Sequence, residues 1–217
     1  MFFRTGRKRI QKSIKKSVQK YCHCRAAQSR NIKSNPINTF MKQLLKNSYC
    51  YLVGPIEYAD NCFDWRVTVT ESVKQIGIKC FDPNKDHFVN QLTETQEDRD
   101  NLKTQRETGD WKSISKYMKG VISRDLRMVD LSTFIIGKID PEVPTFGTIH
   151  EIVIASLQNK PILLYTDDKK KFPLWLAGLI NMDLVFETWG EIVEYLMKIN
   201  SGEIYADPKY WKILAQN

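Results

Sequence analysis

The chain has 217 residues, of which 42% are hydrophobic and 27% are charged, and its formal net charge is +8. This length suits one domain with an appendage, and the composition is that of a globular protein. No apolar run is long enough to span a membrane as a helix, which argues against a helical membrane protein. We therefore expect a soluble, cytoplasmic protein without a membrane partner.

The positive charge is concentrated near the N-terminus. Residues 1–46 hold 13 of the 33 Lys and Arg residues and no acidic residue, whereas the rest of the chain holds 20 basic and 25 acidic residues. Ile10, Ile14 and Val18 recur every four residues, which predicts a basic helical arm over residues 1–47. Such an arm favours contact with nucleic acid or another polyanion. Its composition is also typical of an organellar targeting peptide, the less favoured alternative.

The cysteines show neither a paired framework nor a CxxC motif. They are Cys22, Cys24, Cys50, Cys62 and Cys80. The Cys-His-Cys run at residues 22–24 places its ligands too close together to complete a tetrahedral zinc site by itself. The sequence therefore predicts free thiols, no metal site and no cofactor.

Beyond residue 47, short apolar strands alternate with helices. The predicted strands cover residues 50–54, 78–83, 133–140, 161–166 and 183–186. The predicted helices cover residues 64–77, residues 113–132, a segment that begins near Thr148, and residues 188–199. Residues 89–120 form a highly charged insertion, which is either a helical lid or a solvated surface segment.

This alternation predicts an α/β body over residues 48–217. We expect a Rossmann-like (flavodoxin-like) doubly wound parallel sheet of about five strands, with helices on both faces. Ligands of open sheets bind beyond the carboxyl ends of the strands. The loops after Val53, Phe81 and Ile139 are therefore expected to meet at one crevice.

Residues 147–152, GTIHEI, allow two interpretations. Thr148 and Glu151 have the T-x-x-E spacing of a capping box, which closes a helix N-terminus. The same spacing would hold the Glu151 carboxylate at the positive end of a helix dipole. The other carboxylates near strand ends are Glu57, Asp60, Asp82, Asp125 and Asp140. Since the usual nucleotide-binding and hydrolase motifs are absent, paired carboxylates suited to cleaving a glycosidic bond are the main chemical signal.

Three segments, taken in order, resemble the nucleoside 2-deoxyribosyltransferase family. They are YLVGP at residues 51–55, RDLRMVDLSTFIIG at residues 124–137 and GTIHEIVIASLQNKPILLY at residues 147–165. The stretch GPIEYADNCFDWR, residues 54–66, is similar to the first loop of phage-encoded relatives. The resemblance spans residues 51–166 and implies a viral enzyme of nucleotide metabolism, active in the host cytoplasm as a homo-oligomer and without a cofactor.

The resemblance also implies roles for particular residues. Glu151 is expected to be the nucleophile that forms a covalent deoxyribosyl intermediate, Asp125 to assist the base, and Tyr51 to lie near Glu151. Thr145 replaces the aspartate of enzymes that act on free nucleosides, and related nucleotide hydrolases carry a serine there, so Thr145 favours a nucleotide. The other expected substrate-binding residues are Gly54, Pro55, Glu57, Trp65, Arg66, Asp82, Gly147 and Thr148.

Two of these assignments carry explicit alternatives. Trp65 and Arg66 are expected to clamp a base or a phosphate, or else to supply helix packing and a surface charge. Thr148 is expected to cap its helix, which would leave Glu151 free to react.

The sequence therefore predicts cleavage or transfer at the N-glycosidic bond of a 2′-deoxyribonucleoside or its 5′-monophosphate. The alternative is a non-catalytic nucleic-acid-binding or assembly protein that reuses the fold and contacts a polyanion through residues 1–46.

Overall fold

The computed structural model describes residues 42–56, 63–85, 87–88, 95–143 and 145–216. Most of the basic arm, together with Glu57 and Asp60, lies outside these ranges. The predicted contact of the arm with a polyanion therefore stays a prediction.

The described part of the chain forms a sheet of five parallel strands in the order β2-β1-β3-β4-β5. The strands are β1 (Tyr49–Val53), β2 (Lys79–Phe81), β3 (Phe134–Lys138), β4 (Ile162–Tyr165) and β5 (Val185–Phe186). This is the strand order of flavodoxin-like doubly wound folds. The predicted fold class is confirmed, and each predicted strand is present.

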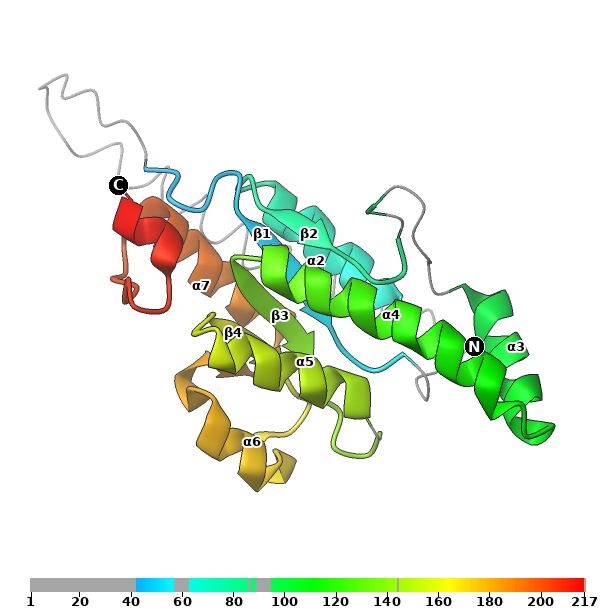
Figure 1. Cartoon of the computed structure of the whole chain (residues 1–217). Coiled ribbons are helices and arrows are strands. Elements are labelled where there is room, and N and C mark those ends of the chain that lie inside the picture. The colour runs from blue at the N-terminus through cyan, green and yellow to red at the C-terminus, as the bar shows by residue number, and fades with distance from the viewer. Residues whose placement is uncertain (1–41, 57–62, 86, 89–94, 144, 217) are drawn as a thin grey trace, which may run out of the picture.

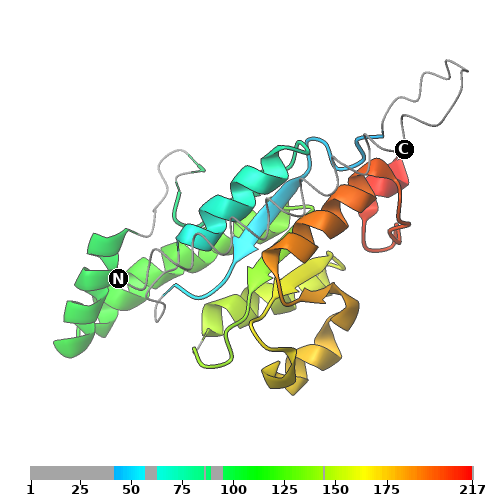
Figure 2. The same cartoon turned by 180° about the vertical axis from the view of Figure 1, so that it is seen from behind.

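Helices connect the strands. They are α2 (Asp64–Lys74), α3 (Gln96–Glu107), α4 (Trp111–Leu131), α5 (Phe146–Leu157), α6 (Leu174–Leu179) and α7 (Trp189–Ser201), with 3-10 turns η1 (Lys169–Lys171), η2 (Met182–Leu184) and η3 (Lys212–Gln216). Helices α4 and α5 lie in front of the sheet in Figure 1, and α2 and α7 lie in front of it in Figure 2. The sheet is therefore covered on both faces.

Each face of the sheet packs against its own core. Cys50 and Leu52 of β1 belong to a cluster with residues of α2 and α7, such as Val69. Tyr51 and Val53, which point the other way, belong to a cluster with residues of α4 and α5. Because successive side chains of a strand alternate between faces, a strand buried on both sides becomes a continuous apolar run.

Close packing at the centre of the sheet requires a glycine at position 137. A Cβ added there would lie 2.7 Å from both Val53 Cγ1 and Leu164 Cδ2, in the strands on either side of β3. No side chain fits at that separation without displacing its neighbours.

The described part of the charged insertion contains helix α3 and the start of helix α4. Helix α3 begins with a capping box at Thr95 and Asp98, buries no side chain, and packs against α4. Helix α4 begins inside the predicted insertion, at Trp111, and continues to the strand β3. Its buried positions include the charged residue Arg124, whereas the apolar Ile122 is 45% exposed.

In the described part of the chain, no helix combines the length and the apolar character needed to cross a membrane.

Lys160 holds the C-terminus of α4. Its Nζ donates hydrogen bonds to the carbonyl oxygens of Val129 (2.5 Å), Asp130 (2.8 Å) and Ser132 (2.6 Å). The last carbonyls of a helix have no partner within the helix, so an ammonium group at this position satisfies them. The contact ties the segment before β4 to the helix before β3.

We expect the substitution Lys160→Met to lower the free energy of unfolding by about 2 kcal/mol, because charged hydrogen bonds to helix carbonyls are lost while the aliphatic stem is kept. Urea denaturation followed by circular dichroism measures the change. Lys112→Met, on the exposed side of α4, is the matched control and should change stability by less than about 0.5 kcal/mol. Equal effects of the two substitutions would contradict this role for Lys160.

Candidate active site

The strand order determines where a ligand site is expected. Strand β1 lies between β2 and β3, and the chain leaves β1 and β3 toward opposite faces of the sheet. In doubly wound sheets, a crevice opens at this point beyond the carboxyl ends of the two strands. Gly54 and Pro55, directly after β1, are both buried at this edge.

Tyr51 and Glu151 are in contact in the core, near the carboxyl ends of the strands. The Tyr51 hydroxyl, on β1, donates a hydrogen bond of 2.8 Å to Glu151 Oε1, on α5. Tyr51 is 1% exposed and Glu151 is 8% exposed. Burial, the negative charges of Glu151 and Asp125, and this hydrogen bond raise the pKa of Tyr51 well above its ordinary value, while Arg66 acts against the shift. Tyr51 is therefore a stable hydrogen-bond donor to the carboxylate.

The start of α5 corrects the expected helix cap. The helix begins at Phe146, with Thr145 as the N-cap residue, and Ile149 N donates to the Thr145 carbonyl to close the first turn. Thr148 is thus the third residue of the helix and is buried, so the prediction that it caps the helix was wrong. The T-x-x-E spacing is not a capping box here, and the Glu151 carboxylate bonds to Tyr51 across the core.

Asp125 lies on the buried side of α4 with Arg124. The Arg124 Nε and Nη2 atoms donate to Asp125 Oδ1 at 3.0 and 2.8 Å, and both residues are at most 9% exposed. Asp125 also acts electrostatically on Tyr51, so its charge is felt at the Tyr51–Glu151 pair. An ion-paired carboxylate is a hydrogen-bond acceptor. This geometry suits Asp125 to orienting a donor group of a ligand.

Arg66 is fully buried, and its guanidinium group bonds to other groups of the protein. Its Nη2 donates to the Gly54 carbonyl at 2.9 Å and its Nε to the Leu52 carbonyl at 3.3 Å. Its Nε also lies 3.9 Å from Asp82 Oδ1, and its guanidinium lies 4.5 Å from the centre of the Trp65 ring. The alternative that Arg66 is a surface charge was therefore wrong.

Trp65 packs within an aromatic stack. Its ring lies 4.8 Å from that of Trp189, which in turn lies 4.4 Å from the ring of Tyr165. Trp65 is 4% exposed and packs against the loop that follows β1. A Cβ added at Gly54 would lie 2.9 Å from Trp65 Cζ2, so the two residues fit closely.

Asp82 is 3% exposed and bonds mainly to its own loop. It accepts hydrogen bonds from the main-chain and side-chain nitrogens of Asn84, and its Oδ2 lies 3.7 Å from Lys85 Nζ. The structure thus places Asp82 beside Arg66 at the end of β2. Thr145 is half-buried and makes no side-chain cap bond, while Gly147 is exposed with no atom near its missing Cβ.

Several expected site residues are therefore in contact or in electrostatic range of one another. The interacting residues are Tyr51, Gly54, Trp65, Arg66, Asp82, Asp125 and Glu151. The sequence did not predict a role for Arg124. Neighbouring residues of a helix point in different directions, so their spacing carries no signal of a contact between them.

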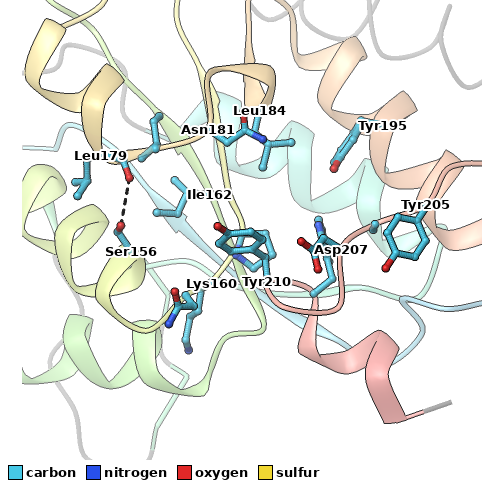
Figure 3. A pocket seen from close by; sticks show the side chains of 15 residues that line it. Ser156, Lys160, Ile162, Leu179, Asn181, Leu184, Tyr195, Tyr205, Asp207 and Tyr210 are labelled. Atoms are coloured by element: carbon cyan, nitrogen blue, oxygen red, sulfur yellow. Dashed lines mark hydrogen bonds between the residues drawn. The ribbon is translucent and has the colours of Figure 1, made fainter.

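A cavity of about 570 Å³ lies elsewhere, at the amino end of β4. Figure 3 shows side chains that line it, including those of Lys160, Tyr195, Tyr205 and Asp207. None of the expected site residues lines this cavity. Chemistry that depends on Tyr51 and Glu151 therefore belongs to the opposite edge of the sheet. Within the described ranges, no group of three or more His, Cys, Asp or Glu side chains is suited to holding a metal ion.

A scan against models of protein families finds no match, and a search of curated proteins finds none either. Among solved structures, the chain is similar to a 2-deoxyribosyltransferase from the psychrotolerant bacterium Bacillus psychrosaccharolyticus. The identity is 18% over 67% of this chain and 90% of that chain, with a TM-score of 0.46. The fold assignment accordingly rests on the strand order and register of this chain.

We expect Gly54→Ala to lower the free energy of unfolding by about 1–3 kcal/mol, because the added methyl group meets Trp65, which is buried and stacked on Trp189. Gly147→Ala, in open space in the first turn of α5, is the matched control and should be neutral or slightly stabilising. Thermal unfolding of both variants measures the difference. A neutral Gly54→Ala variant would show that the Trp65 stack gives way.

Proposed function

We propose that this protein breaks the N-glycosidic bond of a 2′-deoxyribonucleoside or of its 5′-monophosphate, with Glu151 as the nucleophile. The proposal combines the resemblance of residues 51–166 to nucleoside 2-deoxyribosyltransferases with the arrangement of the carboxylates at the carboxyl edge of the sheet. The single observation that carries it is the 2.8 Å hydrogen bond from Tyr51 to Glu151.

That hydrogen bond matters because it separates the two interpretations of Glu151. In a capping box the carboxylate accepts from the main chain at the start of its own helix. Here it accepts from a tyrosine 100 residues earlier in the sequence and keeps 8% of its surface exposed. A carboxylate held by an oriented donor and largely shielded from water is suited to attack at C1′.

Asp125 is assigned the orientation of the base. Because Arg124 donates two hydrogen bonds to Asp125 Oδ1, the carboxylate is an acceptor for an N–H group of the base and is poorly suited to donating a proton. The base leaves C1′ with the electron pair of the glycosidic bond and takes up a proton from solvent. Water or a second base then attacks the glycosyl–Glu151 ester and regenerates the carboxylate.

The hydroxyl of Thr145 supports a nucleotide as the substrate. It stands at the N-terminus of α5, where unpaired main-chain N–H groups favour an anion, and it does not bond to the helix as a cap. Purified protein, incubated with deoxynucleosides, deoxynucleoside 5′-monophosphates and their ribose counterparts, should release free base from a member of the deoxy series. Chromatography with and without an acceptor base separates hydrolysis from transfer, and a panel without base release contradicts the proposal.

We expect Glu151→Gln to reduce base release by at least about 1,000-fold, because the amide keeps the shape of the side chain but is a poor nucleophile. Initial rates with the best substrate of the panel measure the effect. Glu203→Gln, on the exposed surface after α7, removes the same charge and should leave the rate unchanged. If the Glu151 variant retains wild-type activity, Glu151 is a structural residue.

We expect base release to be insensitive to ionisation of Tyr51 up to about pH 10, the ordinary pKa of tyrosine. Since the pKa of Tyr51 is raised above that value, its proton and its bond to Glu151 are fully present below pH 10 and are lost only as the pH rises through the folded-state pKa. A pH–rate profile of wild-type protein and of Tyr51→Phe tests this. An alkaline loss of activity below pH 10 that disappears in Tyr51→Phe would contradict the shift.

A further inference from the structure

Two cysteine thiols face each other across the sheet, away from the chemistry proposed above. Cys50 of β1 and Cys80 of β2 are direct partners in the parallel register, and their Sγ atoms are 3.1 Å apart. Both are free cysteines. The sequence alone shows no pairing, because 30 positions separate the two residues and only the strand register brings them together.

The main-chain geometry of this pair is compatible with a covalent bond. Adjacent strands lie about 4.8 Å apart. That separation falls within the range of about 4.4–6.8 Å that the Cα atoms of a disulfide span. Register partners also direct their Cβ atoms to the same face of the sheet, so both thiols point the same way and no movement of the main chain across the sheet is needed.

The two thiols differ in their access to solvent. Cys50 is fully buried in the core between the sheet and α2 and α7, whereas Cys80 is half-buried on β2, the strand at the edge of the sheet. Burial, followed by the neighbouring Cys80, raises the pKa of the Cys50 thiol well above its ordinary value. An oxidant therefore reaches Cys80 first, with Cys50 held in place behind it.

We propose that Cys50 and Cys80 form a thiol-oxidation site, which a hydroperoxide converts into a disulfide between β1 and β2. Cys80 loses its proton and its sulfur attacks the peroxide, which forms a sulfenic acid and releases water or an alcohol. The Cys50 sulfur then attacks the Cys80 sulfur and forms the S–S bond. The displaced hydroxide takes up the Cys50 proton and becomes water. One molecule of peroxide therefore accepts the two electrons that the two thiols lose.

This disulfide would reinforce a junction that already supports the carboxyl edge. Arg66 connects the same two strands through the Leu52 carbonyl and Asp82. A covalent link two residues before each of these positions adds a second connection between the strands. The disulfide also lowers the conformational entropy of the unfolded chain, which raises the free energy of unfolding. The inference rests on the sheet register and on the thiol contact, and it does not depend on the proposed function.

The test uses the full chain with Cys22, Cys24 and Cys62 replaced by Ser, so that only the paired thiols remain. One equivalent of hydrogen peroxide, added to this variant in its folded state, should remove both titratable thiols. The intact mass should fall by about 2 Da, the mass of two hydrogens. Dithiothreitol should reverse the change, the product should run as a single chain on a non-reducing gel, and its midpoint of thermal unfolding should rise.

Cys80→Ser in the same background is the matched control and should show no mass loss. If the triple replacement does not fold, oxidised and alkylated wild-type protein is digested instead, and one disulfide-linked peptide pair should contain Cys50 and Cys80. Unreacted thiols, oxygen addition without a disulfide, a link between two chains, or pairing with one of the other cysteines would each overturn the proposal.

Discussion

A fully buried guanidinium holds the carboxyl edge of this sheet together. Arg66 reaches from α2 to the carbonyls of Leu52 and Gly54 at the end of β1, and to Asp82 at the end of β2. A buried cation is tolerated only when its hydrogen bonds and its charge are both satisfied, so these partners must stay in place together. The Trp65 ring stacks on Trp189 and also packs against the Arg66 guanidinium. The same ring lies so close to position 54 that a glycine fits there best.

The rigid edge positions a second buried pair on the other face of the sheet. Tyr51 belongs to the same strand whose carbonyls bind Arg66, and its side chain points toward α5, where it meets Glu151. Asp125 adds its charge from α4, and Arg124 satisfies it. The charges of two largely buried carboxylates, Glu151 and Asp125, therefore act on one buried tyrosine. At buried positions electrostatic interactions are stronger than at the surface.

Strands, helices and the class of the fold could be predicted because their signals are local. Apolar runs such as residues 50–54 and 161–166 read as strands buried on both faces, and their alternation with helices predicts a parallel sheet. The start of α5 could not be predicted as well. Thr148 and Glu151 have capping-box spacing, but the helix begins three residues earlier, with Thr145 as its N-cap residue and without a side-chain cap bond. In the described part of the chain, capping boxes begin α3 at Thr95 and α7 at Thr188, and both threonines are exposed.

The sequence by itself determined the α/β architecture and the residue types available at the carboxyl edge, since periodicity and strand-end position are properties of short segments. Only the tertiary structure decided which of these residues meet. The Tyr51–Glu151 bond, the Arg124–Asp125 pair, the burial of Arg66 and the Cys50–Cys80 contact each depend on strand register or on helix rotation. Strand register and helix rotation are set by the burial of many side chains together. A shift of one residue in a strand would turn every one of its side chains to the opposite face of the sheet.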